Sequence, residues 1–164
     1  MSGKKKFSNT LQERFLGTVP LSLTSSSGIG KKCAFNFSFF DENQDHACSW
    51  DKLGNDKILS LIDKLKHYTN DSLEYWKREK LLVEYGDFPP KGKTDFNHPR
   101  HVPADVRWAR FRVEGAFRLI GFLIPSELHN EPCENNGVGG EKHFYNRNVF
   151  YVVFLDPEHR FWKS

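Results

Sequence analysis

Two strand-like segments meet at the dipeptide Glu114-Gly115, and this junction constrains the fold more than any other part of the sequence. Val106 to Val113 and Ala116 to Ile124 carry the β-branched, aromatic and alternating apolar residues that are typical of strands. A glycine in a short turn supplies the positive φ that a tight hairpin requires. The sequence therefore predicts an antiparallel β-hairpin over residues 106–124.

The register of this hairpin decides which side chains share a face of the sheet. With a two-residue loop, Arg118 shares a face with Phe111. With a three-residue bulged loop, Val113 lies opposite Phe117, and the arginines fall on one face: Arg110, Arg112 and Arg118. We expect the second register, because it separates the charged side chains from the apolar ones.

Two further strands are predicted on either side of a helical region. Val149 to Leu155 is almost wholly apolar, as expected of a central strand buried on both faces, and Asp156-Pro157 ends it. Near the other end of the chain, phenylalanines alternate with polar residues over 35–39, which indicates a half-buried first strand.

The region between these strands shows helical spacing. Apolar residues recur with the period of one helix face at Ile58, Leu61, Ile62, Leu65 and Tyr68. Residues 69–86 restart a helix, because Asp71 and Glu74 resemble a capping box and Gly86 suits a left-handed stop. The proline-rich residues 87–105 predict a long loop. Helices segregated from a run of strands indicate an α+β fold, in which a helical hairpin packs on a small antiparallel sheet.

Length, charge and cysteine content define the broad class. The 164 residues fit one domain, for which we expect residues 32–164, preceded by a flexible basic arm at residues 1–31. The net charge is only +3, and the positive charge collects in the arm and on the arginine-rich strands. Three cysteines without a CxxC pair argue against a disulfide framework, and no segment reaches the ~18 apolar residues of a membrane helix. We therefore expect a cytoplasmic protein that does not enter a membrane.

The arginines and aromatic residues of the last third suggest RNA binding. Guanidinium groups pair bidentately with phosphate, and aromatic rings stack on bases. The candidate RNA-binding residues are Arg107, Trp108, Arg110, Arg112, Arg118, Arg160 and Tyr151. Two simpler interpretations stay open: strand arginines often pair with acids on an exposed face, and Tyr151 has the apolar neighbours of a core residue.

Acid/base chemistry is assigned to the C-terminal segment LDPEHRF. His159 titrates near neutrality and can move the proton of a ribose 2′-hydroxyl, while an arginine stabilises the charge on phosphorus. Asp156 can orient this histidine, although Asp followed by Pro also makes an ordinary turn. His101 is the candidate for a second acid/base group, or a solvated loop residue. Metal-ligand spacings such as HxH or CxxC are missing, so we expect neither a metal nor a cofactor.

This pattern, covering Phe35 to Trp162, resembles the RelE/ParE-like toxin superfamily, including the HigB type. The segment LDPEHRF is also similar to the ends of uncharacterised phage- and defence-associated proteins. The resemblance implies a metal-independent, ribosome-dependent mRNA endonuclease with RNA, the ribosome and an antitoxin-like protein as partners. It places Arg112 and Arg118 at the phosphate, and Asp156 with His159 in the acid/base region.

An alternative function stays open at this point. The ParE-like branch of the superfamily consists of proteins that are not nucleases, so a shared fold does not decide activity. Arg, Trp and Tyr are also the residues that protein interfaces favour. The sequence is therefore equally compatible with a non-catalytic module that binds a protein or a ribosome.

Overall fold

The computed structural model describes residues 10–11, 14, 28–129, 131–132 and 144–163. The chain divides into two compact units, Met1–Lys31 and Lys32–Ser164. The described part of the first unit includes the 3-10 helix η1 (Ile29–Lys31) and the helical residues 10–11 and 14. All elements discussed below belong to the second unit.

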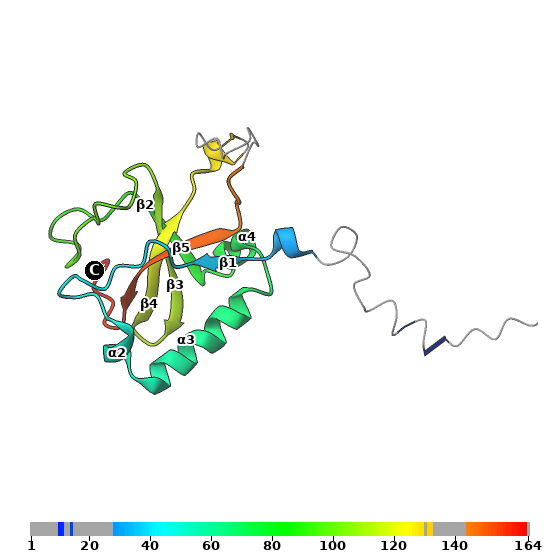
Figure 1. Cartoon of the computed structure of the whole chain (residues 1–164), viewed down its shortest axis with the longest axis horizontal. Helices are drawn as coiled ribbons and strands as arrows, with labels where there is room; N and C mark the ends of the chain where they lie inside the picture. Colours follow the sequence, from blue (N-terminus) through cyan, green and yellow to red (C-terminus); the bar gives the residue numbers. More distant parts are fainter. Residues whose placement is uncertain (1–9, 12–13, 15–27, 130, 133–143, 164) are drawn as a thin grey trace, which may run out of the picture. The chain divides into compact units, whose positions relative to one another are not determined.

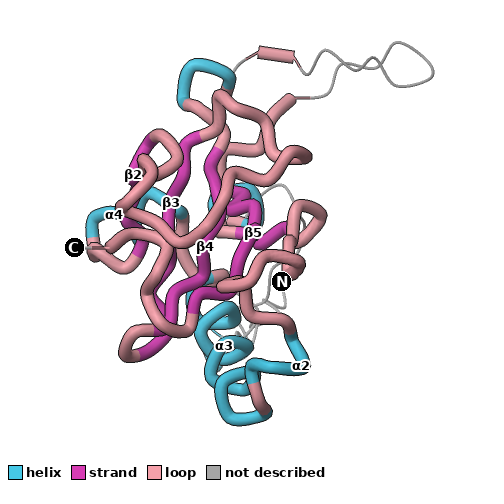
Figure 2. Tube along the Cα trace, turned by 90° about the vertical axis from the view of Figure 1, so that its left-hand side faces the viewer, coloured by secondary structure: helices cyan, strands magenta, loops and turns pink. Residues whose placement is uncertain are grey.

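The second unit contains a five-stranded mixed sheet with the order β1-β5-β4-β3-β2. Its strands are β1 (Ala34–Asn36), β2 (Leu82–Gly86), β3 (Arg107–Glu114), β4 (Phe117–Leu123) and β5 (Val149–Asp156). The short β1 runs parallel to β5, and every other pairing is antiparallel. Figure 2 shows β2, β3, β4 and β5 side by side. Together with the helices, this sheet confirms the predicted α+β class.

Helices cover one face of the sheet, which we call the helix face. They are α2 (Trp50–Leu53), α3 (Asn55–Tyr68) and α4 (Leu73–Arg78). Leu61, Tyr68 and Trp76 from these helices pack with Phe111 and Phe150 from the sheet in one apolar cluster. Ile62 is an exception to the predicted helix face, because it is exposed.

The second predicted helix is shorter than its sequence pattern suggested. It begins after Ser72, whose hydroxyl accepts from Tyr75 N at 3.1 Å, so Ser72 rather than Asp71 is the cap. It ends at Arg78, and the residues predicted to continue it form β2 instead. Leu81 N donates to Trp76 O and Lys80 N to Lys77 O, a Schellman motif with Lys80 in the left-handed conformation at φ 58°.

Lys80→Gly is expected to stabilise the protein, because a lysine with positive φ carries a steric cost that glycine avoids. We expect the free energy of unfolding to rise by about 1 kcal/mol, measured by urea denaturation. Arg78→Gly, in the exposed last turn of the same helix, is the matched control and should lower it by a similar amount. A destabilised Lys80→Gly variant would contradict this explanation of the helix end.

The hairpin of β3 and β4 places the arginines as predicted. Arg112 lies opposite Arg118, and the alternation along the strands puts Arg110 on the same face. The expected pair of Val113 with Phe117 is wrong, since Phe117 pairs with Glu114 and the register shifts between Arg112 and Glu114. The bulge therefore lies in β3 and not in the loop. It still places Arg110, Arg112 and Arg118 on one face, as predicted.

The other face of the sheet carries the segment between β2 and β3 and the residues after β5, so we call it the loop face. Phe96 from the segment and Phe161 from the C-terminal residues are buried against Trp108 and Phe154 of the sheet. Backbone hydrogen bonds join the two segments, from Asp95 N to Arg160 O and from Lys163 N to Lys93 O. Figure 1 shows the C-terminal end beside the loop that follows β2.

Candidate functional site

One row of the sheet brings charged residues from three strands together on the loop face. Arg118 on β4 lies opposite Arg112 on β3 and opposite Asp156 at the end of β5. Arg110 is two residues from Arg112 on the same face, and His159 follows Asp156 by three residues. With Tyr85 of β2, the residues Arg110, Arg118, Asp156 and His159 form what we call the Arg118 cluster. Arg112 lies beside it at the exposed end of the hairpin.

Arg118 is the most enclosed cation of this cluster, with a relative exposure of only 9%. Its Nη1 donates to the carbonyl oxygens of Gly115 at 2.6 Å and Phe117 at 2.9 Å, which fixes the side chain. Burial lowers the pKa of Arg118, and the positive charges of Arg110 and Arg112 lower it further. The site therefore holds like charges close together in a partly desolvated place, which favours an anion between them.

Asp156 shapes the turn that carries the histidine. Its buried carboxylate accepts from Arg160 N and from Phe161 N, both at 2.9 Å. Phe161 is buried under the sheet, so the turn is attached at both ends. Asp156 therefore makes the turn that its sequence also indicated, while its role in orienting His159 stays a prediction.

His159 occupies this turn with a left-handed backbone, φ 59°, which is unusual for a residue with a side chain. The imidazole is half-buried, and desolvation together with Arg118 and Arg110 lowers its pKa below 6.5, while Asp156 opposes the shift. The neutral form therefore predominates at neutral pH. A neutral imidazole is a proton acceptor, which is the role that a general base requires.

Tyr85 belongs to the cluster although the sequence did not indicate it. Burial raises the pKa of its hydroxyl, and the nearby guanidinium groups of Arg110 and Arg118 oppose this. Its ring stacks on Trp162, with centroids 4.7 Å apart and planes at 11°. The misread helix concealed this residue, because a tyrosine in a helix would not face the strand arginines.

Two predicted RNA-binding residues lie outside the Arg118 cluster. Arg107 is on the helix face, since it alternates with Arg110, and its Nε lies 3.0 Å from a carboxylate oxygen of Glu84. Trp108 is on the loop face but only 1% exposed, covered by Phe88 and Phe161 among other rings. A buried indole does not stack on a base, so the role predicted for Trp108 is wrong.

The remaining candidates are engaged elsewhere. His101 stacks on Phe39, and its Nε2 is 3.0 Å from Phe39 O. Phe39 packs at the Phe122 end of the sheet, where Tyr151 stacks on Phe122 with centroids 4.9 Å apart. Phe122 is four residues, about 13 Å, along the strand from Arg118. His101 and Tyr151 are thus distant from the cluster.

Arg160 points to a different set of partners. Its guanidinium forms ion pairs with Glu158 at 2.5 Å and with Asp95 at 3.8 Å. Its charge is therefore already compensated, unlike that of Arg118.

Of the predicted site residues, the fold brings four together: Arg110, Arg118, Asp156 and His159. Arg112 lies next to them.

The Arg118 cluster has buried nitrogen atoms that no group in the described part of the chain satisfies. Arg110 Nε, Arg118 Nε and His159 Nε2 are buried and have no hydrogen-bond partner within the described ranges. Two guanidinium charges face one carboxylate, which is itself used by backbone N–H groups. This arrangement can accept an anion with several oxygens, such as a phosphate.

Neither a metal centre nor a membrane helix is found in the part of the chain that the structure describes. Its His, Cys, Asp and Glu residues form no group of three or more that could hold a metal ion. None of its helices has the length and apolar character needed to cross a bilayer.

Comparisons with known proteins place this chain in no family. A search of protein-family models found no match. Curated proteins gave no match either, and the same holds for solved structures. The function has to be argued from the Arg118 cluster itself.

Proposed function

We propose that the protein is a metal-independent endoribonuclease of the toxin type, which holds an RNA phosphodiester at the Arg118 cluster. Arg110 and Arg118 bind the phosphate oxygens, and Arg112 binds a neighbouring phosphate of the strand. His159 takes the proton of the ribose 2′-hydroxyl, and the 2′-oxygen bonds to phosphorus to form a 2′,3′-cyclic phosphate. The bond from phosphorus to the 5′-oxygen breaks, and the 5′-oxygen leaves as a hydroxyl after taking a proton from water.

One observation carries this proposal. Guanidinium groups from a hairpin and an imidazole with a lowered pKa share one face, where buried nitrogens have no hydrogen-bond partner in the described part of the chain. The resemblance to RelE/ParE-like toxins forms part of the proposal. It is supported by the order of a first strand, three helices and then four strands that pair with one another antiparallel.

A second candidate is a protein that binds RNA, a ribosome or a partner protein without cleaving RNA. The observation in its favour is that His159 Nε2 is enclosed, so that only part of the imidazole is available to a substrate. The two candidates share the phosphate site. They differ in whether the bond to the 5′-oxygen breaks.

Incubation of the purified protein with RNA in EDTA, with and without ribosomes, tests the proposal. We expect fragments that end in a 2′,3′-cyclic phosphate, and we expect Arg118→Gln to weaken RNA binding and to leave only a low residual cleavage. Ribosome-dependent cleavage would define the partner of the site. If the wild type binds RNA without cleaving it, and Arg118→Gln binds it more weakly, the second candidate is favoured. Cleavage that EDTA abolishes would contradict the metal-independent reaction.

The pH dependence of cleavage follows from the lowered pKa of His159. A general base must be neutral, so kcat/KM should rise with pH through a midpoint below 6.5. Arg118→Gln removes a positive neighbour, so in its residual activity the rise should move to higher pH. The pH profile of kcat/KM, measured for the wild type and for Arg118→Gln, checks this. The same midpoint in both proteins would contradict it.

A further inference from the structure

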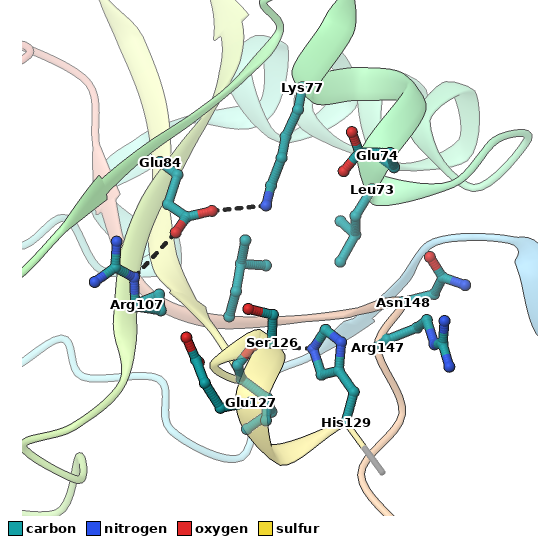
Figure 3. A pocket seen from close by; sticks show the side chains of 12 residues that line it. Leu73, Glu74, Lys77, Glu84, Arg107, Ser126, Glu127, His129, Arg147 and Asn148 are labelled. Carbon is teal, nitrogen blue, oxygen red and sulfur yellow. Dashed lines mark hydrogen bonds and ion pairs between the residues drawn. The ribbon is translucent and has the colours of Figure 1, made fainter.

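A hollow lies on the helix face, separate from the Arg118 cluster. Its volume is about 470 Å³. Its walls come from α4, β2, β3, the end of β4, the 3-10 helix η2 (Ser126–Leu128) and the residues before β5. Figure 3 shows its side chains. Arg107 lines this hollow, whereas Arg110 belongs to the opposite face of the same strand.

One wall of the hollow is held by an ion-pair network. Glu84 accepts from Lys77 Nζ at 2.6 Å and from Arg107 Nε at 3.0 Å, the two dashed contacts on the left of Figure 3. Burial would raise the pKa of Glu84, but these two hydrogen bonds hold it below its usual value. The carboxylate therefore stays charged, and because two cations share it, this wall keeps one net positive charge.

Other charged groups of the hollow lack such partners. Arg147, Glu74 and Glu127 line it, and within the described ranges none of the three has a hydrogen bond or an ion pair from its side chain. They come from three different elements, so a guanidinium and two carboxylates border one space. Buried Leu73 and Leu123, with half-buried Ile124, supply an apolar surface between them.

We propose that this hollow binds a short apolar peptide with free ends, of two or three residues. The terminal carboxylate pairs with Arg147, whose planar guanidinium matches it bidentately. The terminal ammonium pairs with Glu74 or Glu127, and the apolar side chains lie on Leu73, Leu123 and Ile124. A zwitterion suits a space that borders charges of both signs, and hollows of about 300–1,000 Å³ are typical of small-ligand sites.

Titration of the full chain with leucyl-leucine, followed by amide NMR spectra, tests this proposal. We expect saturable shifts confined to the residues around Leu73, Leu123 and Arg147. N-acetyl-leucyl-leucine lacks the ammonium, and leucyl-leucinamide lacks the terminal carboxylate. Each should bind at least about 10-fold more weakly. Equal binding of all three, or no saturable shift with leucyl-leucine, would overturn the proposal.

Substitutions at exposed positions test the site without disturbing the core. Arg147→Gln should weaken leucyl-leucine binding by about 10-fold or more and should leave the affinity for leucyl-leucinamide unchanged. Arg78→Gln, on the exposed side of α4 and outside the hollow, is the matched control and should bind as the wild type does. Unchanged binding by Arg147→Gln would contradict the assigned carboxylate partner. RNA cleavage should be equal in these variants, so this test does not depend on the Arg118 cluster.

Discussion

His159→Asn is expected to lower RNA cleavage by about 10²- to 10⁴-fold, the contribution that a general base makes to such reactions. Asparagine is the replacement of choice because it tolerates the left-handed backbone that His159 adopts, with φ 59°. The turn held by Asp156 should therefore stay in place, and the melting temperature should change little. RNA affinity should also be retained, because the phosphate contacts come from the arginines.

Single-turnover cleavage of a labelled oligoribonucleotide, with a parallel binding assay, measures this effect. His101→Asn is the matched control, because it removes an imidazole that packs against Phe39, far from the cluster. It should cleave at the wild-type rate. Full activity in His159→Asn would remove the histidine from the reaction, and a loss of the same size in His101→Asn would mean that the acid/base groups are wrongly assigned.

Gly121→Ala is expected to lower the free energy of unfolding by about 3 kcal/mol or more, at the upper end for overpacking a core. A Cβ at this position would lie 2.1 Å from Tyr151 O and 2.7 Å from a ring carbon of Phe150. The clash is with backbone of the neighbouring strand, so it cannot be relieved by turning a side chain. The register between β4 and β5 shifts at this point, between Ile120 and Gly121.

Urea denaturation followed by circular dichroism checks this expectation. Gly30→Ala is the control, since no atom lies within 4 Å of the Cβ that it would add. It should melt as the wild type does. The irregularity at Gly121 also matters for the site, because beyond it Arg118 lies opposite Asp156. A Gly121→Ala protein with wild-type stability would contradict the close approach of the two strands.

Local patterns predicted those parts of the fold in which local preference and tertiary packing agree. The alternation in β3 and the apolar run of β5 follow from which faces are buried, and both strands form where they were expected. The strand β2 was missed. Its residues follow a helix without glycine or proline between them. The helix ends at Arg78, and Lys80, which takes the left-handed conformation after it, gives no sign of a stop in the sequence.

The candidate site was predictable to the extent that it depends on strand register. Arg110, Arg112 and Arg118 share a face because of the hairpin, and Asp156 joins them because β5 pairs with β4. The burial of Trp108 depends on Phe88, Phe161 and other rings that come from a loop and the C-terminal residues. Loop packing has no periodic signal in a sequence, so the burial of Trp108 was not predicted. Tyr85 was missed for another reason, because its strand β2 was predicted as part of a helix.

The most direct test of the phosphate site is an NMR titration of the His159 imidazole, with and without an oligoribonucleotide blocked at its 2′-oxygens. In the free protein we predict a pKa below 6.5, because desolvation, Arg118 and Arg110 disfavour the charged form. A bound phosphate beside the imidazole adds negative charge, so the RNA should raise this pKa. A pKa that the RNA leaves unchanged, or one above 6.5 in the free protein, would contradict the account.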